Sequence, residues 1–133
     1  MTISLSFTSL LVAEPDRSVA FYADVFGLPE VASLASPHFR GLRIGPTVLG
    51  FSGPKAYELL HLTEPAPGSV GVDTFLTFEA ASIEEVDELT DRATAHGATV
   101  LAPPAETYYG AWQAVLADPD GHVFRINHLR LDD

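Results

Sequence analysis

Histidine is the residue type in this 133-residue sequence that most often binds metals or transfers protons, and five histidines are present. None of them belongs to a His-x-His or a His-x-Glu pair. His122 and His128 fall in one predicted strand, where six residues of rise separate them by roughly 20 Å, too far for one ion with ligands at about 2 Å. The sequence has no cysteine, which excludes thiolate nucleophiles and cysteine zinc sites. Histidine and cysteine therefore predict no metal centre.

Few other side chains could act as a catalytic acid or base. Glu79, His38, Tyr109 and Arg125 are the available groups, and no two of them have a spacing that is typical of a catalytic dyad. We therefore predict no catalytic residue and interpret these groups as part of a binding surface.

The first half of the chain predicts a helix between short strands. Residues 3–13 are rich in apolar and hydroxyl side chains and predict a strand. Pro15 suits the first turn of a helix, apolar residues then recur at helical spacing, and Gly27 ends it. Further strands are predicted around 30–35, 39–44 and 47–52.

The same order of elements returns after a linker at 53–71 that is rich in glycine and proline but apolar enough to pack in part. Residues 72–80 predict a strand, and Ser82 with Glu85 forms a capping box at the start of a helix. Strands around 98–102, 111–117 and 122–128 follow. The repeat predicts an α+β fold of two βαβββ modules, residues 1–52 and 72–133, within a single domain. Their curved half-sheets must close on each other or on a partner chain.

The charge balance limits the possible partners. The formal net charge is −11, and such a surface repels nucleic-acid phosphates and anionic membranes. The N-terminus has no basic segment of a signal peptide, and no apolar run approaches the roughly 18 residues of a membrane span. We expect a cytoplasmic protein that binds neither nucleic acid nor membrane.

Three motifs occur in the order typical of one superfamily. The segment DRSVAFYADVFGL at 16–28 resembles the first-helix signature of the vicinal oxygen chelate superfamily, which includes glyoxalase I, extradiol dioxygenases and bleomycin-resistance proteins. Residues 84–87 and 95–98 resemble the helix of its second module, and DPDGH at 118–122 resembles its second hallmark. The resemblance covers nearly the whole chain and implies mixed sheets curved around a cleft. Its drug-binding members imply a homodimer with ligand clefts at or near the interface.

The resemblance also identifies the positions where metal-dependent members hold a divalent ion. Carried over to this sequence, they are Phe7, Gly50, Phe75 and Arg125. Phenylalanine and glycine side chains have no lone pair, and a guanidinium has no acceptor. We therefore predict no metal and no other cofactor.

Alternation along the strands predicts which side chains line the cleft. Phe7, Ser9 and Leu11 are expected on one face of the first strand. Phe75, Thr77 and Glu79 are expected on the equivalent face of the strand at 72–80, because Leu76 and Phe78 are needed under the second helix. Trp112, Ala114, Leu116 and Arg125 are expected to point inward as well. Each aromatic residue could also belong simply to the core. Arg125 needs a partner if it is buried, and either Glu79 or a ligand could supply one. The predicted ligand-binding residues are Phe7, Ser9, His38, Phe75, Thr77, Tyr109, Trp112 and Arg125.

We expect a ligand-binding protein rather than an enzyme. The favoured function is metal-independent sequestration of a hydrophobic or aromatic natural product, as in the antibiotic self-resistance members that the chain resembles. A metal-free isomerase or cyclase of natural-product biosynthesis is the alternative, and a divalent-metal lyase or dioxygenase is less favoured. Trp112 is the single tryptophan and is expected to report binding by quenching.

Overall fold

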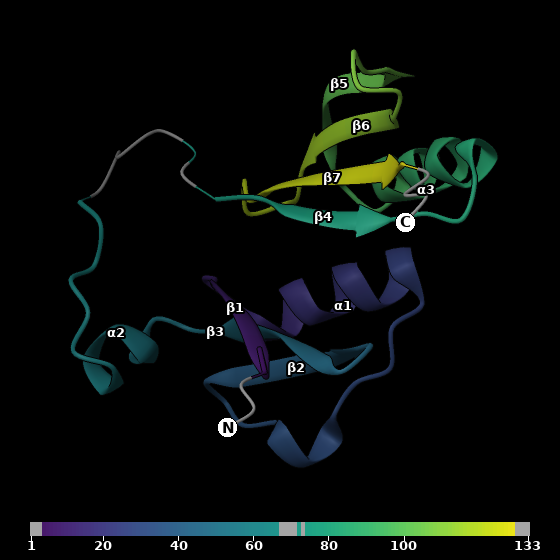
Figure 1. Cartoon of the computed structure of the whole chain (residues 1–133). Helices are drawn as coiled ribbons and strands as arrows, with labels where there is room; N and C mark the ends of the chain where they lie inside the picture. The colour runs from purple at the N-terminus through teal and green to yellow at the C-terminus, as the bar shows by residue number, and fades with distance from the viewer. Residues whose placement is uncertain (1–3, 67–71, 73, 130–133) are drawn as a thin grey trace. The chain divides into compact units, whose positions relative to one another are not determined.

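The computed structural model describes residues 4–66, 72 and 74–129, which divide into two compact units, residues 1–69 and 70–133 (Figure 1). Each unit packs a long helix on one face of a mixed β-sheet. The expected α+β fold of two βαβββ modules is confirmed. Among the described residues, no helix is long and apolar enough to cross a bilayer.

The first unit contains a three-stranded sheet in the order β1-β3-β2. Strands β1 and β3 are parallel, and β2 is antiparallel to β3. The elements are β1 (Phe7–Leu11), α1 (Pro15–Phe26), the 3₁₀ helix η1 (Ala32–Leu34), β2 (Phe39–Ile44), β3 (Thr47–Ser52) and α2 (Lys55–Leu59).

Helix α1 begins and ends as the sequence predicts. Pro15 occupies the first turn, and Gly27 ends the helix at a φ of 67°, in the left-handed region that favours glycine. The helix buries Val19, Tyr22 and Val25. The Tyr22 ring stacks on Phe51 of β3 with 5.3 Å between ring centroids. This packing closes one face of the sheet and leaves the other face open.

The strand predicted around 30–35 is wrong, because residues 32–34 form η1 instead. Only one isolated bridge, between Glu30 and Leu42, extends the sheet there among the described residues. Pro29 has no N–H to donate, although its carbonyl accepts from the amide of Arg43. In the first module, a single bridge therefore stands in the place of the predicted strand.

The predicted linker contains the short helix α2, and part of it packs as expected. Ala56 is buried, whereas Leu59, Leu60 and Leu62 are exposed. The leucines of the linker therefore do not contribute to the core of the first unit.

The second unit contains a four-stranded sheet in the order β4-β7-β6-β5, with β4 and β7 parallel. Its elements are β4 (Leu76–Glu79), α3 (Ile83–Ala95), β5 (Thr99–Glu106), β6 (Trp112–Ala117) and β7 (Val123–His128). Strand β5 is longer than the predicted 98–102 and carries two register shifts in its pairing with β6. It tolerates Pro103 and Pro104 because an edge strand leaves one row of N–H groups unpaired.

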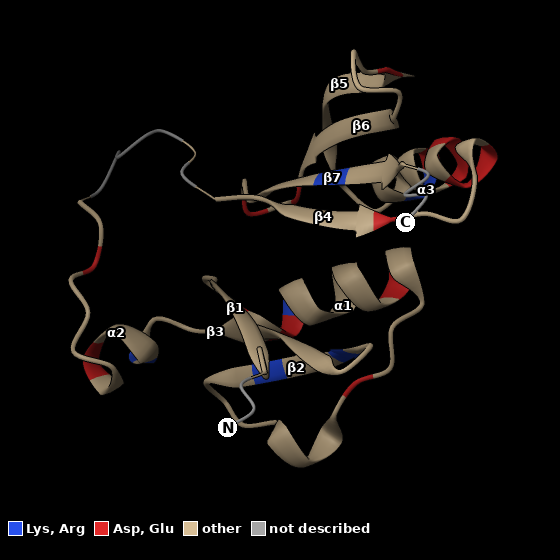
Figure 2. Ribbon diagram, viewed as in Figure 1, with Lys and Arg blue, Asp and Glu red and all other residues tan. Residues whose placement is uncertain are grey.

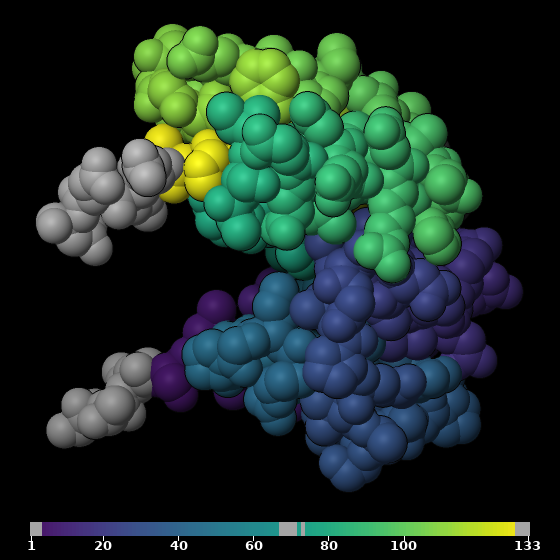
Figure 3. Space-filling view, turned by 90° about the vertical axis from the view of Figure 1, so that its right-hand side faces the viewer, coloured from purple at the N-terminus to yellow at the C-terminus, as the bar shows by residue number. Residues whose placement is uncertain are grey.

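Helix α3 starts at the predicted capping box. The amide of Glu85 donates to Ser82 Oγ, and Glu85 Oε1 accepts from the amide of Ala81. The helix buries Val86, Thr90 and Ala93 against the sheet. Its outer surface, teal to green in Figure 3, is exposed and acidic, as the red segments in Figure 2 show. It includes Glu84, Glu88 and Asp91.

Arg40 of β2 joins three segments of the first unit. Its Nη1 donates to Asp16 Oδ1 at 2.6 Å, and its Nη2 and Nε donate to the two oxygens of Glu30. The hydrogen bonds from Arg40 lower the pKa of Glu30, and the positive charge lowers it further, against the opposing effect of burial. The same partners raise the pKa of Arg40.

Replacing Arg40 by glutamine is expected to lower the free energy of unfolding at pH 7 and to lower it much less at about pH 3. A carboxylate whose pKa is lower in the folded state than in the unfolded state stabilises the fold at pH values above its unfolded pKa. This stabilisation is lost as the pH falls through the folded pKa. Urea unfolding at both pH values measures this difference, with Arg43→Gln, an exposed arginine of the same strand, as the control. Equal losses at both pH values would contradict the assignment.

Candidate functional site

The candidate site lies on the face of the second sheet that does not pack on α3. Residues paired directly across neighbouring strands share a face. Thr77, Arg125 and Val115 form one such row, because Thr77 pairs with Arg125 and Arg125 pairs with Val115. The opposite face, under α3, contains Phe78, Phe124 and Ile126, which are buried. The sequence alternation predicted this division correctly for β4 and β7.

Arg125 lies at the centre of a cluster of side chains on this open face. Its Nε donates to Thr77 Oγ1 at 2.9 Å, and its Nη1 donates to Gln113 Oε1 at 3.0 Å and to Tyr109 Oη at 3.3 Å. Tyr109 in turn donates to Gln113 Oε1 at 3.0 Å. The guanidinium carbon lies 5.0 Å from the centroid of the Phe75 ring, which is a cation–π contact. We call these five residues the Arg125 cluster.

The partners of Arg125 differ from the ones considered at the sequence level. Glu79 is not a partner, because its Oε1 accepts from Asn127 Nδ2 and its Oε2 from the amide of Leu129. Every hydrogen bond of Arg125 to a described residue goes to a neutral oxygen. The guanidinium is therefore held in place without neutralisation of its charge.

The expected inward orientation of Trp112, Ala114 and Leu116 is wrong. Trp112 Nε1 donates to Asp87 Oδ1 of α3 at 2.9 Å, and Ala114 and Leu116 are fully buried on the helix side. Both alternating rows of β6 contain apolar residues, so the sequence alone did not reveal which row faces the helix. Gln113 takes the place on the open face that was assigned to Trp112. A ligand on the Arg125 cluster is consequently not expected to contact Trp112, so quenching of Trp112 emission does not report its binding.

The open face of the first sheet contains Phe7 and Ser9, whereas His38 lies in the loop before β2. Phe7 and Ser9 are exposed there, and Phe7 packs edge-on against Phe39 at 6.1 Å between centroids. The Phe39 ring covers Gly50, where a Cβ would meet two ring carbons at 2.7 Å. Sequence reasoning missed Phe39, although alternation along β2 places it on this face. His38 precedes β2 and is exposed, and its backbone amide donates to Ser36 Oγ.

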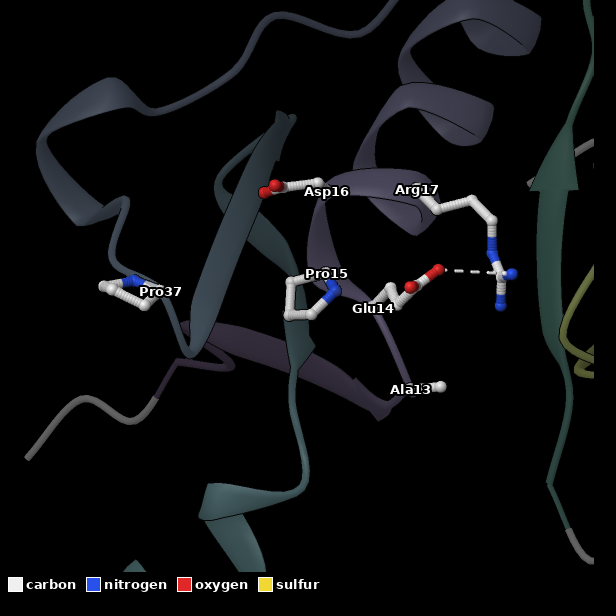
Figure 4. A pocket seen from close by; sticks show the side chains of 6 residues that line it. All are labelled: Ala13, Glu14, Pro15, Asp16, Arg17 and Pro37. Atoms are coloured by element: carbon white, nitrogen blue, oxygen red, sulfur yellow. Dashed lines mark ion pairs between the residues drawn. The ribbon is translucent and has the colours of Figure 1, made fainter.

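Two surface pockets lie outside the Arg125 cluster. One, of about 510 Å³, surrounds the start of α1, where Glu14 pairs with Arg17 at 3.3 Å (Figure 4). Asp16 also lines this pocket and pairs with Arg40 of β2. The other, of about 320 Å³, lies beside Trp112 and Glu106. Neither contains a convergent set of unpaired polar groups, so the Arg125 cluster remains the stronger candidate.

The chain is similar to known proteins over most of its length. Residues 4–126 match the family model of the Glyoxalase/Bleomycin resistance protein/Dioxygenase superfamily. The chain belongs to this superfamily. A crystal structure of a family enzyme from Burkholderia phytofirmans PsJN has 40% identity and a TM-score of 0.90, covering 96% of this chain and all of that one. A glyoxalase-related enzyme from Fulvimarina pelagi, at 24% identity and a TM-score of 0.82, covers 96% of this chain and 89% of that one and supports the fold alone.

A curated relative of this chain is more than twice as long. "Putative glyoxylase CFP32" of Mycobacterium bovis is 30% identical over 129 residues, which are 94% of this chain and 44% of that protein. The chain thus spans less than half the length of this relative. Superfamily membership accounts for the fold and leaves the chemistry to be argued from the residues of the site.

The residues that the resemblance assigns to the superfamily's metal positions do not fit a divalent ion. Phe7 and Phe75 present phenyl rings, Gly50 lies under the Phe39 ring, and Arg125 presents a cation. Oxygen and imidazole donors are what divalent ions require. Among the described residues, no group of three or more His, Asp or Glu side chains is arranged to hold a metal. We therefore derive no chemistry through a metal here.

Proposed function

We propose that this superfamily member binds a flat aromatic ligand on the Arg125 cluster without a metal ion and sequesters it. The observation that carries the proposal is the Phe75 ring, which is 56% exposed and lies beside a guanidinium held only by neutral groups. An exposed aromatic ring next to fixed hydrogen-bonding groups is typical of sites for planar, partly polar molecules.

The expected binding energy is sufficient for capture without covalent chemistry. Burial of about 300 Å² of ligand surface at roughly 25 cal/mol/Å² contributes about 7 kcal/mol before the cost of association. Each aromatic pair adds on the order of 1 kcal/mol. Micromolar sequestration is therefore within reach of this surface. An aromatic natural product as ligand and a homodimer as the working form belong to the same proposal, and light scattering measures the oligomeric state.

Binding is favoured over turnover because the Arg125 cluster holds no group placed as a base. Arginine stays protonated at any physiological pH. The hydroxyl of Tyr109 donates to Gln113, and both carboxylate oxygens of Glu79 accept hydrogen bonds. A metal-free isomerase or cyclase would need a proton acceptor that faces the ligand.

Phe75→Ala is expected to weaken binding of a neutral planar probe, 2-naphthamide, roughly 5- to 30-fold, because the ring contact is worth on the order of 1–2 kcal/mol. The measurement is an NMR titration of EDTA-treated protein. Leu60→Ala is the control, since that side chain is 63% exposed and lies in the first unit.

Two results would contradict the proposed function. One is unchanged affinity in Phe75→Ala, which would place the probe elsewhere. The other is binding that disappears with EDTA and returns with a divalent metal, together with about one equivalent of that metal in the purified protein.

A further inference from the structure

We infer that the ligand carries a carboxylate and that Arg125 receives it, so that the ligand class is a flat aromatic acid. This inference rests on the proposed function and specifies the chemistry of the same site. It follows from the hydrogen-bonding state of Arg125, from the distribution of charge on the sheet and from the position of the Phe75 ring.

The hydrogen bonds of Arg125 fix the guanidinium and leave part of it available. Nε is used by Thr77, and Nη1 is used by Gln113 and Tyr109. Neither N–H of Nη2 has an acceptor among the described residues. A half-buried guanidinium whose orientation is set by three neutral oxygens therefore offers two fixed donors to an incoming group. The two N–H groups diverge from one nitrogen, so a carboxylate is expected to accept one charge-assisted hydrogen bond from Nη2.

The charge around Arg125 is also uncompensated. The structure describes all four strands of this sheet, and Arg125 is the one Lys or Arg that they contain. It accounts for the blue segment of β7 in Figure 2. Elsewhere in this acidic protein, Arg17, Arg40 and Lys55 form ion pairs with carboxylates. Arg125 has no carboxylate within ion-pair distance in the described part of the chain. A buried or half-buried cation gains most from a partner that removes this imbalance.

A negative charge on the same face of the sheet limits where the anion can lie. Glu79 follows Thr77 on the same face of β4, about 7 Å further along the strand. Its oxygens are occupied by Asn127 and by the amide of Leu129, so it does not reach Arg125. Its charge repels an anion at its own end of the sheet. The ligand carboxylate is therefore expected on the side of Thr77, where the Phe75 ring supports an attached aryl group.

The test compares two probes of the same shape that differ in charge, 2-naphthoate and 2-naphthamide, titrated into the full chain and followed by NMR. The wild type is expected to bind 2-naphthoate roughly 10- to 100-fold more tightly, since hydrogen bonds to a charged group add this much. The Arg125 Nε–Hε resonance is expected to shift with 2-naphthoate. In Arg125→Gln the preference is expected to vanish, and in the control Arg92→Gln, an exposed arginine of α3, it is expected to persist.

The outcomes separate the inference from the proposed function. Equal affinity of the wild type for both probes, with binding still dependent on Phe75, overturns the carboxylate and leaves the proposed function standing. Binding of neither probe overturns the proposed function and the inference with it. If Arg125→Gln does not fold, the wild-type preference and partial retention of that preference in Arg125→Lys decide the question.

Discussion

Asp118→Ala is expected to lower the free energy of unfolding by about 2–4 kcal/mol, because two backbone amides lose a charged acceptor that is itself buried. Asp118 is 6% exposed, and its Oδ1 accepts from the amides of Asp120 and His122 at 2.8 and 3.0 Å. The turn connects β6 to β7 and so sets the position of Arg125. Urea unfolding at pH 7 measures the loss.

Asp118→Asn is the matched control for this prediction. Its amide oxygen can accept the same two hydrogen bonds without the charge, so most of the stability is expected to return. A change of less than about 0.5 kcal/mol in Asp118→Ala would show that the turn does not need its side chain. The superfamily hallmark at 118–122 would then require a role beyond the turn.

Gly50→Ala is expected to cost about 1–3 kcal/mol, because a Cβ at this position would meet the Phe39 ring at 2.7 Å and Ser9 Oγ at 3.0 Å. The ring must move before any side chain fits, so the cost is expected to be much smaller in a Phe39→Ala background. The double-mutant cycle, measured by urea unfolding, isolates this coupling. Gly50→Glu is expected to destabilise the fold for the same reason, and this cost is also expected to be smaller in the Phe39→Ala background. It is expected to bind no divalent metal, since no imidazole or carboxylate pairs with position 50 across β1 or β2.

Gly53→Ala is the control for Gly50, because its Cβ would meet its nearest neighbour, Pro15 Cγ, at an ordinary 3.4 Å. It is expected to change stability little. An equal cost of Gly50→Ala with and without the Phe39 ring would contradict the assignment of Phe39 as the group that fills this position.

The misses of sequence reasoning have identifiable causes. The periodicity of 30–35 was compatible with a strand, but the local 3₁₀ turns of η1 and the missing donor of Pro29 limited the pairing to one bridge. Trp112 was assigned to the wrong face because both rows of β6 are apolar enough for the core. The position of Phe39 over Gly50 depends on cross-strand packing, which no local pattern encodes.

The sequence by itself determined the superfamily, the long helices α1 and α3, the Gly27 end of α1, the capping box of α3, and the faces of β4 and β7, because these depend on local periodicity and on turn and capping residues. The resemblance also predicted that the metal positions hold Phe7, Gly50, Phe75 and Arg125. Tertiary structure decided what these residues do. Thr77, Gln113 and Tyr109 come from separate segments, and only strand pairing brings them around Arg125. Side-chain contacts between distant segments depend on register and packing, so the uncompensated charge of Arg125 became visible only in the folded sheet.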